Sequence, residues 1–367
     1  MINITFILCF FTASCSFQTK IFQGINKQYI NKNVIVSPLS AYQILGLKAN
    51  GANGKTLEQM LLSLSNEDLE ELNDVNVEIL KASKDFTTIE IANAIMTTFK
   101  PKEKFLAASL QYESTIETLK SITQVNNWCN LKTHGKIQKI LDELPPNTVM
   151  ILLNALYFKG TWIKEFPENE TRTGNFYNYN DESKLANVDF MSISEGFNYY
   201  EDQEMQIIEI PYTKDSMSAV VILPNKDINI NDFISDLTDD KLQKAIKRMN
   251  TKEVQLKLPK FELEFSSSLK EVLQNLGMVD AFNQAKADFT GMRDEKDIYV
   301  GGVIQKTYLK VDEKGTEAAA VTAVIIQTRS VPSYKRMNVD RPFLFLLRNK
   351  KLPQNYEMLF MAKIEEL

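Results

Sequence analysis

The segment that follows Glu313 most constrains what this chain can fold into. It places Gly315 before a run of alanines and then continues into an apolar run that ends at Pro332. Read with a period of two, one set of alternate positions is small or apolar, and the other set holds every charge. The first set is Thr316, Ala318, Ala320, Thr322, Val324, Ile326 and Thr328. The segment could therefore become a strand that buries one face without burying a charge.

Glycine at position 315 and the alanines lower the steric cost of moving this segment from a loop into a sheet. The competing interpretation is an alanine-rich helix that begins after Gly315, because alanine is the best helix former. The valines and isoleucines that follow favour a strand instead. The sequence thus predicts a segment that can exist in two states.

The rest of the composition is that of an ordinary globular protein. Of 367 residues, 44% are hydrophobic and 24% are charged, which is enough apolar material for a large core. We find no linker rich in proline, glycine or serine, no repeat and no low-complexity tract. One large domain is therefore expected, although the length alone suggests two. The net charge of −5 and the lack of a long basic run argue against nucleic acid as a partner.

Few residues are available for catalysis or for metal binding. Cys9, Cys15 and Cys129 show no metal-ligand spacing, and His134 is the only histidine. The stretch Lys-Thr-His-Gly-Lys around His134 reads as an exposed turn, so we expect no catalytic role for it. The sequence predicts a protein that is not an enzyme and that uses no metal or other cofactor.

The first sixteen residues are typical of a short secretory signal. Ile4 to Phe11 is apolar and small residues follow, so we expect cleavage near Ser14 to Ser16, although the residues before the apolar run include no lysine or arginine. The apolar run is far too short to span a bilayer, and no membrane association is expected.

This prediction divides the chain into a signal at 1–16 and a single domain at 17–367. The mature protein would then be extracellular, Cys129 would be its only cysteine, and Asn169 would be a possible glycosylation acceptor. The alternative is that residues 1–16 extend the first helix, in which case a cytoplasmic protein is expected.

Helices are expected mainly in the first half of the chain. Their expected ranges are Phe17 to about Ile30, Ser37 to Asn50, a helix capped by Thr56, 67–84, Val125 to Leu141 with a break near Gly135, and Leu269 to Leu276.

Strands are expected mainly later. Their expected ranges are Asn33–Val36, Ile89–Met96, Thr148–Phe158, Gln206–Ile210, Met217–Leu223, Val254–Leu258, Ile298–Val311, Phe343–Leu347 and Met358–Ile364. Asn154 interrupts an apolar strand and must find hydrogen-bond partners if it is buried. The mixture predicts an α+β protein.

The residues from Val311 to Ala319 read Val-Asp-Glu-Lys-Gly-Thr-Glu-Ala-Ala, which resembles the reactive-loop hinge of the serpins, the serine protease inhibitor superfamily. Other stretches resemble further serpin motifs in the family's order, and together they cover nearly all of the chain after Ser16. They are 33–40, 125–128 with 133–137, 153–162, 258–261, 276–278, 287–291, 341–345 and 359–364. The resemblance implies a serpin fold, with three β-sheets surrounded by about eight or nine helices and an exposed reactive-centre loop at about 313–336.

Two positions depart from the family's pattern. Gln305 stands where serpins usually have a histidine that hydrogen-bonds toward Asn154, Ser37 and Ser40. The resemblance implies that this network controls the opening of the large sheet, and glutamine can both donate and accept there. Ala362 stands where glycine is usual. Trp162 resembles the tryptophan that follows the family's central strand.

The resemblance implies a suicide-substrate inhibitor. A protease attacks the exposed loop, forms an acyl-enzyme and is trapped when the cleaved loop inserts into the large sheet. Serpins are cleaved roughly sixteen residues after the hinge glutamate, and sixteen after Glu313 is Arg329, so the expected bond is Arg329–Ser330. Arginine fits the carboxylate-based specificity pocket of trypsin-like proteases. Gln327 and Thr328 are weaker choices, and Lys335 with Arg336 is too far from the hinge.

Non-inhibitory serpins tend to carry bulky or charged residues in the hinge. This chain keeps small ones, which favours an inhibitor: Gly315, Thr316, Ala318, Ala319 and Ala320. Heparin activation is not expected, because the region after Thr56 is acidic, with Glu67, Asp68, Glu70, Glu71 and Asp74.

The expected partner is therefore a trypsin-like serine protease held in a covalent complex by a monomeric inhibitor. Two alternatives stay open: a cross-class inhibitor of papain-like cysteine proteases, and a non-inhibitory serpin that acts as a chaperone or carrier.

Overall fold

The computed structural model describes residues 15–83, 89–144, 148–158, 160–213, 216–316 and 334–367. Within these ranges the α-helices are α1 (Phe17–Gln28), α2 (Pro38–Ala49), α3 (Gly54–Leu64), α4 (Leu69–Ser83), α5 (Glu103–Gln111), α6 (Ile122–Lys132), α7 (Ile230–Ser235), α8 (Asp239–Arg248) and α9 (Lys270–Asn275). No helix in this part of the chain is long and apolar enough to cross a membrane.

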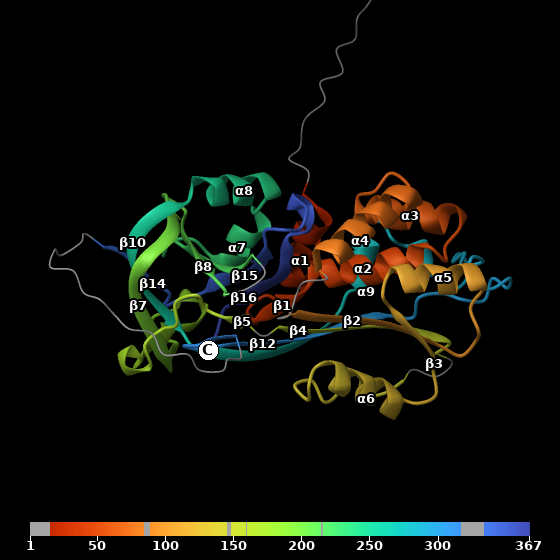
Figure 1. Ribbon diagram of the computed structural model, residues 1–367, viewed down its shortest axis with the longest axis horizontal. Coiled ribbons are helices and arrows are strands. Elements are labelled where there is room, and N and C mark those ends of the chain that lie inside the picture. Colours follow the sequence, from red (N-terminus) through yellow and green to blue (C-terminus); the bar gives the residue numbers. More distant parts are fainter. Residues whose placement is uncertain (1–14, 84–88, 145–147, 159, 214–215, 317–333) are drawn as a thin grey trace, which may run out of the picture.

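The largest sheet has nine strands. Its strands are β1 (Val34–Val36), β16 (Met358–Ile364), β15 (Phe343–Asn349), β9 (Met217–Pro224), β8 (Met205–Pro211), β7 (Leu185–Glu201), β10 (Asn250–Pro259) and β14 (Lys335–Asn338) in spatial order, with β6 (Arg172–Tyr177) paired to β7. Figure 1 shows this sheet at the end of the molecule opposite to α3, α4 and α5. Every residue of β16 is buried, and only Arg348 of β15 is not fully buried.

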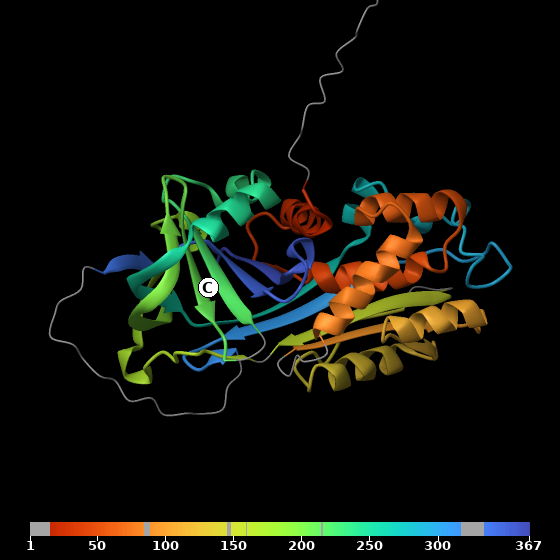
Figure 2. The same cartoon turned by 45° about the horizontal axis from the view of Figure 1, so that its top comes forward.

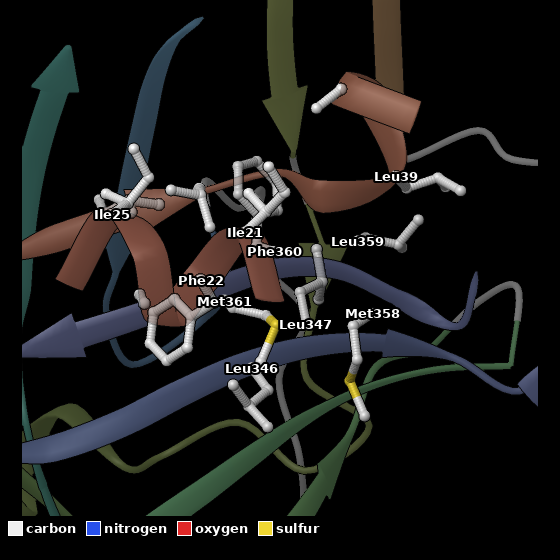
Figure 3. Close-up of a cluster of buried hydrophobic side chains, with 14 of the residues drawn as sticks. Ile21, Phe22, Ile25, Leu39, Leu346, Leu347, Met358, Leu359, Phe360 and Met361 are labelled. Carbon is white, nitrogen blue, oxygen red and sulfur yellow. The ribbon is translucent and has the colours of Figure 1, made fainter. Parts of the chain in front are cut away.

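Helix α1 covers this sheet through one apolar face. Its side chains Ile21, Phe22 and Ile25 are completely buried, and Figure 3 shows them in one apolar cluster with Leu346 of β15 and Met361 of β16. Removal of this much apolar surface from water is the main contribution that such a core makes to stability.

The second sheet has five strands in the order β11 (Phe261–Ser268), β12 (Val303–Val311), β4 (Met150–Phe158), β2 (Ile89–Thr97) and β3 (Thr115–Thr118). Figures 1 and 2 show α6 on one face of this sheet and α2 on the other. A third, two-stranded sheet joins β5 (Gly160–Thr161) to β13 (Gly315–Thr316). The α+β mixture predicted from the sequence is therefore present.

Helix α2 is buried on all sides and carries a lysine in its last turn. Lys48 has no exposed surface, and its Nζ lies 3.1 Å from Sδ of Met150, 2.7 Å from Sδ of Met292 and 3.7 Å from the centre of the Phe289 ring. Burial lowers the pKa of this amine well below its ordinary value, because burial disfavours the charged form. Lys48 is therefore a buried amine whose neighbours include only weak sulfur acceptors and an aromatic ring.

Two predicted helix boundaries are wrong. The cap of α3 is Asn53 rather than Thr56, whose hydroxyl instead accepts a hydrogen bond from the Asp288 amide at 2.9 Å. Helix α6 ends at Lys132, and residues up to Leu141 do not continue it. Asn126 supplies the missing partners there, since its Oδ1 accepts from the amides of Ile140 and Leu141 at 2.9 and 3.1 Å.

Candidate functional site: the loop hinge and the seam of the five-stranded sheet

The chain leaves β12 through a tight turn before it enters the segment that the sequence singled out. The Asp312 amide donates to the Gly315 carbonyl at 2.9 Å, and the Gly315 amide donates back to the Asp312 carbonyl at 3.1 Å. The turn directs Gly315 and Thr316 onto β5, opposite Thr161 and Gly160 respectively. The hinge, defined here as residues 312–316, is therefore held in a short sheet of its own rather than in line with β12.

Gly315 is required by close packing. Its φ is +142°, and a Cβ at this position would lie 2.0 Å from the carbonyl oxygen of Gly160. A side chain at 315 would push β13 off β5, because the obstacle is backbone and cannot rotate away. The sequence suggested that Gly315 provides conformational freedom. The structure shows that glycine is required there because the backbone of Gly160 lies too close for a side chain.

Two aromatic residues, Trp162 and Tyr212, contact the hinge. Trp162 is buried, its Nε1 donates to the Asp312 carbonyl at 3.1 Å, and its amide donates to the Lys314 carbonyl at 3.0 Å. The indole stacks on the ring of Tyr212, with centroids 4.2 Å apart, and the Tyr212 hydroxyl lies 3.0 Å from Oγ1 of Thr316. The predicted tryptophan thus touches the hinge directly.

Glu313 connects the hinge to two other parts of the chain. Its side chain is 10% exposed; its Oε2 is 3.0 Å from Nζ of Lys260, and its Oε1 accepts from the Thr171 hydroxyl at 2.7 Å. Burial opposes ionisation of this carboxyl, but the hydrogen bonds from Thr171 and Lys260 outweigh it and lower the pKa of Glu313. The carboxylate is therefore charged at neutral pH and holds the turn in place.

The predicted network of Ser37, Ser40, Asn154 and Gln305 is assembled in the middle of the five-stranded sheet. Gln305 faces Asn154 across the β12–β4 pair, and its Nε2 donates to Oδ1 of Asn154 at 3.0 Å. The same amide group donates to the Ser37 carbonyl at 2.9 Å and accepts from the Ser37 amide at 2.8 Å. Asn154 in turn donates to the Ser40 hydroxyl. Glutamine thus fills the place of the histidine with both its donor and its acceptor.

A further strand extends this arrangement on each side. Asn93 of β2 lies opposite Asn154 and accepts from it at 2.7 Å. Ser267 of β11 lies opposite Gln305, but its buried hydroxyl has no hydrogen-bond partner within the described residues. We call the side chains of Asn93, Asn154, Gln305 and Ser267 the polar row. The row crosses four neighbouring strands and contains no titratable group.

The seam between β12 and β4 is the shortest contact between long strands of this sheet. Over the described residues the parallel pairing runs from Val303 opposite Leu152 to Thr307 opposite Leu156, although both strands continue toward the hinge. On the other side, β12 is paired to β11 from Ile304 opposite Ser268 up to Val311 opposite Phe261. On the side that faces β4, the part of β12 after Thr307 therefore lies beyond the strand pairing. This least engaged part of the seam is next to the turn at 312–315.

The remaining predicted positions separate into three groups. The predicted reactive bond and alanines lie outside the described residues: Ala318, Ala319, Ala320, Arg329 and Ser330, together with Gln327 and Thr328. Lys335 and Arg336 form part of β14, which pairs with β10, and Nζ of Lys335 is 2.7 Å from Glu201. Asn169 and His134 are exposed, and Ala362 is fully buried in β16.

The sequence did not reveal Lys260, Thr171, Tyr212 and Asn93. Lys260 belongs to one of the motifs quoted above, but its ion pair with Glu313 could not be foreseen because the two residues are distant in the chain. Asn93, like Asn154, is an asparagine inside an apolar strand, and that shared pattern was a usable signal.

Three comparisons with known proteins agree with this geometry. The family model described as "Serpin (serine protease inhibitor)" matches residues 12–367. The chain is 34% identical to Iripin-8 of Ixodes ricinus, covering 91% of this chain and 88% of that protein. It is 32% identical to human Serpin B8, covering 92% and 95%.

Among solved structures, the thermophilic serpin tengpin in its native state superposes with a TM-score of 0.87 and 32% identity, covering 96% of this chain and 92% of that one. The predicted serpin fold is thereby confirmed. Serpins are in general protease inhibitors rather than enzymes, and the family and its inhibitory members support that activity here. The chain belongs to the serpin family.

Proposed function

We propose that this protein is a suicide-substrate inhibitor of trypsin-like serine proteases and that it is cleaved between Arg329 and Ser330. The observation that carries the proposal is the position of the hinge. Small residues, Gly315 and Thr316, are held next to the least engaged part of the β12–β4 seam. A bulky or charged side chain at these positions would oppose entry into the sheet, and neither residue has one.

The covalent step follows the chemistry of serine proteases. The protease serine attacks the Arg329 carbonyl carbon, and the bond from that carbon to the Ser330 nitrogen breaks. The products are an ester to Arg329 and a new amino terminus on Ser330, which takes the proton. Arginine at this place selects proteases whose specificity pocket ends in a carboxylate.

The existing turn defines the register in which the released segment would enter the sheet. Asp312 already pairs with Gly315 in antiparallel fashion. Continuing the same pairing places Thr316 opposite Val311, and each further pair keeps the small alternate set of the segment beside the buried residues of β12. We infer that Thr322 then reaches Gln305.

Insertion at this register has a specific cost at the polar row. A strand between β4 and β12 separates them by two strand spacings of about 4.8 Å, so the 3.0 Å bond from Gln305 to Asn154 must break. A threonine hydroxyl can both donate and accept, and could bond to both amides from the new strand. The row is therefore compatible with insertion without leaving a buried amide unpaired.

The test is incubation with trypsin, followed by a denaturing gel and mass spectrometry of the released peptide. A complex that resists denaturation, with a peptide that starts at Ser330, supports the proposal. Arg329→Ala should remove the complex with trypsin, whereas Lys335→Ala, a matched basic position in β14, should leave it intact. Clean cleavage without a complex would indicate a substrate-like or non-inhibitory serpin, and a complex cut elsewhere would overturn the assigned bond. A parallel incubation with papain tests the cross-class alternative.

We also propose that the protein is secreted and free of heparin control. The apolar start of the chain supports secretion, and exposed Asn169 would then be open to glycosylation. The acidic residues before and within α4 are exposed, which disfavours a polyanion there. Mass spectrometry of protein secreted by eukaryotic cells, before and after glycosidase treatment, tests secretion and the glycosylation of Asn169.

A further inference from the structure

The first turn of α1 is bound by a carboxylate from a distant part of the chain. Asp239, the first residue of α8, accepts from the Ser16 hydroxyl at 2.8 Å and from the Thr19 hydroxyl at 2.5 Å. Its other oxygen, Oδ2, meets the backbone nitrogen of Ser16. One side chain therefore binds the start of α1 through three donors, while it also lies in the first turn of its own helix.

This position is favourable for a negative charge and sensitive to what the Ser16 nitrogen carries. A carboxylate near a helix N-terminus is stabilised by the helix dipole, and Asp239 lies at the N-termini of both α1 and α8. An amide nitrogen at Ser16 offers one hydrogen and no charge. An α-amino group at the same atom would offer three hydrogens and a positive charge at neutral pH, and that charge would add a Coulomb attraction to the Asp239 carboxylate.

The sequence before Ser16 permits cleavage at this point. Signal cleavage requires small residues one and three positions before the bond. Cys15 and Ala13 satisfy this rule for the Cys15–Ser16 bond, and Ser14 with Thr12 satisfies it for the preceding bond. Ser16 with Ser14 satisfies it for the Ser16–Phe17 bond, which is the boundary expected above from the division at residues 16 and 17. The sequence alone therefore leaves three candidate bonds.

The structure distinguishes them. Cys15 is only partly buried, and its Sγ is 4.0 Å from the Leu237 carbonyl, whereas Ser16 meets the Asp239 carboxylate through both its hydroxyl and its nitrogen. A start at Phe17 would remove Ser16 and both of these contacts. We propose that the mature chain begins at Ser16 and that its new α-ammonium group forms an ion pair with Asp239. The pair links α1 to α8, and α1 in turn covers β15 and β16 of the nine-stranded sheet.

The first test is the N-terminal peptide of the full chain after secretion from eukaryotic cells, read by mass spectrometry. Ser16 is expected as the first residue, and a single free thiol, that of Cys129, is expected per molecule. A first residue of Cys15 or Phe17, or retention of Met1, would overturn the assignment.

The second test concerns the ion pair and uses chains released from a cleavable fusion. One chain begins at Ser16, and the other carries two additional glycines before Ser16, which move the charge away. Thermal unfolding at pH 6.5 should show a melting temperature about 1–2 °C higher for the chain that begins at Ser16.

Asp239→Asn should abolish that difference. Asp240→Asn is the matched control, because Asp240 lies in the same turn but pairs with Lys244 at 2.6 Å, and it should preserve the difference. Equal melting temperatures for the two starts, or a difference that persists in Asp239→Asn, would refute the ion pair. Neither test depends on protease inhibition, so its outcome is separate from that of the proposed function.

Discussion

Replacement of Glu313 by glutamine tests whether the hinge is held by charge. The substitution keeps the shape of the side chain but removes the charge from a site that is 10% exposed. A hydrogen bond to a charged group contributes about 1.5–3 kcal/mol, and a neutral one about 0.5–1.5 kcal/mol. The ion pair adds at most about 1 kcal/mol, because the Lys260 side chain is 36% exposed and screened by water.

The expected loss is therefore about 1–3 kcal/mol in the stability of the native hinge. Release of the hinge must break these contacts before the segment can enter the sheet. Conversion of uncleaved protein to a non-inhibitory form should then be roughly tenfold to a hundredfold faster, since each 1.4 kcal/mol is a factor of ten in rate. The measurement is loss of trypsin-inhibiting capacity over time at 45 °C, together with the melting temperature at a fixed scan rate.

The wild-type protein should also show a pH dependence that the variant lacks. The pKa of Glu313 is lower in the folded protein than in the unfolded chain. Its stabilising contribution is therefore complete above about pH 4.5 and is lost as the pH falls through the folded pKa. Glu168→Gln is the control, because Glu168 pairs with hinge residue Lys314 at 3.6 Å but is 71% exposed. If Glu313→Gln matches wild type in conversion rate, melting temperature and pH profile, the hinge is not held by this carboxylate.

Three other substitutions have expected outcomes that thermal unfolding can check. Gly315→Ala should lower the melting temperature through about 1–3 kcal/mol of strain, since its Cβ meets backbone; Gly301→Ala, with open space around it, should be neutral. Lys48→Met should raise stability by about 1–3 kcal/mol, because it removes a buried amine without strong acceptors. The folded pKa of Lys48 is depressed, so the unfolded chain binds the extra proton and wild-type stability falls as the pH drops below about 10; the gain should therefore be larger at pH 6.5 than at pH 9.5. Ser267→Ala should leave stability unchanged or slightly increased, because the hydroxyl has no partner within the described residues.

Sequence patterns were sufficient where one local signal decides the structure. Ser37 and Pro38 mark the start of α2, and the apolar run around Asn154 forms a strand with that asparagine bonded inside the sheet. The short helices α5, α7 and α8 were missed, because helices of six to ten residues depend on packing more than on propensity. For α8 a signal existed: Thr238 caps the helix, and Asp239 lies in its first turn.

The hinge contacts could be predicted only in part. The small residues of the segment are visible in the sequence, and so is the motif around Trp162. The contact between Glu313 and Lys260, and the backbone that Gly315 must approach, depend on the third sheet. Two-residue strands such as β5 and β13 leave no periodic pattern, so no sequence rule could place them opposite each other.

The position of β15 and β16 determines what a cut at Arg329–Ser330 would leave behind. The fragment 330–367 contains both strands, and β15 lies between β9 and β16 while β16 lies between β15 and β1. Nearly all of their side chains are buried, so the fragment cannot dissociate without exposing the interior of the nine-stranded sheet. A nicked molecule should therefore keep its hydrodynamic size, and gel filtration in native buffer would not distinguish it from the intact chain; only denaturant would separate the two pieces.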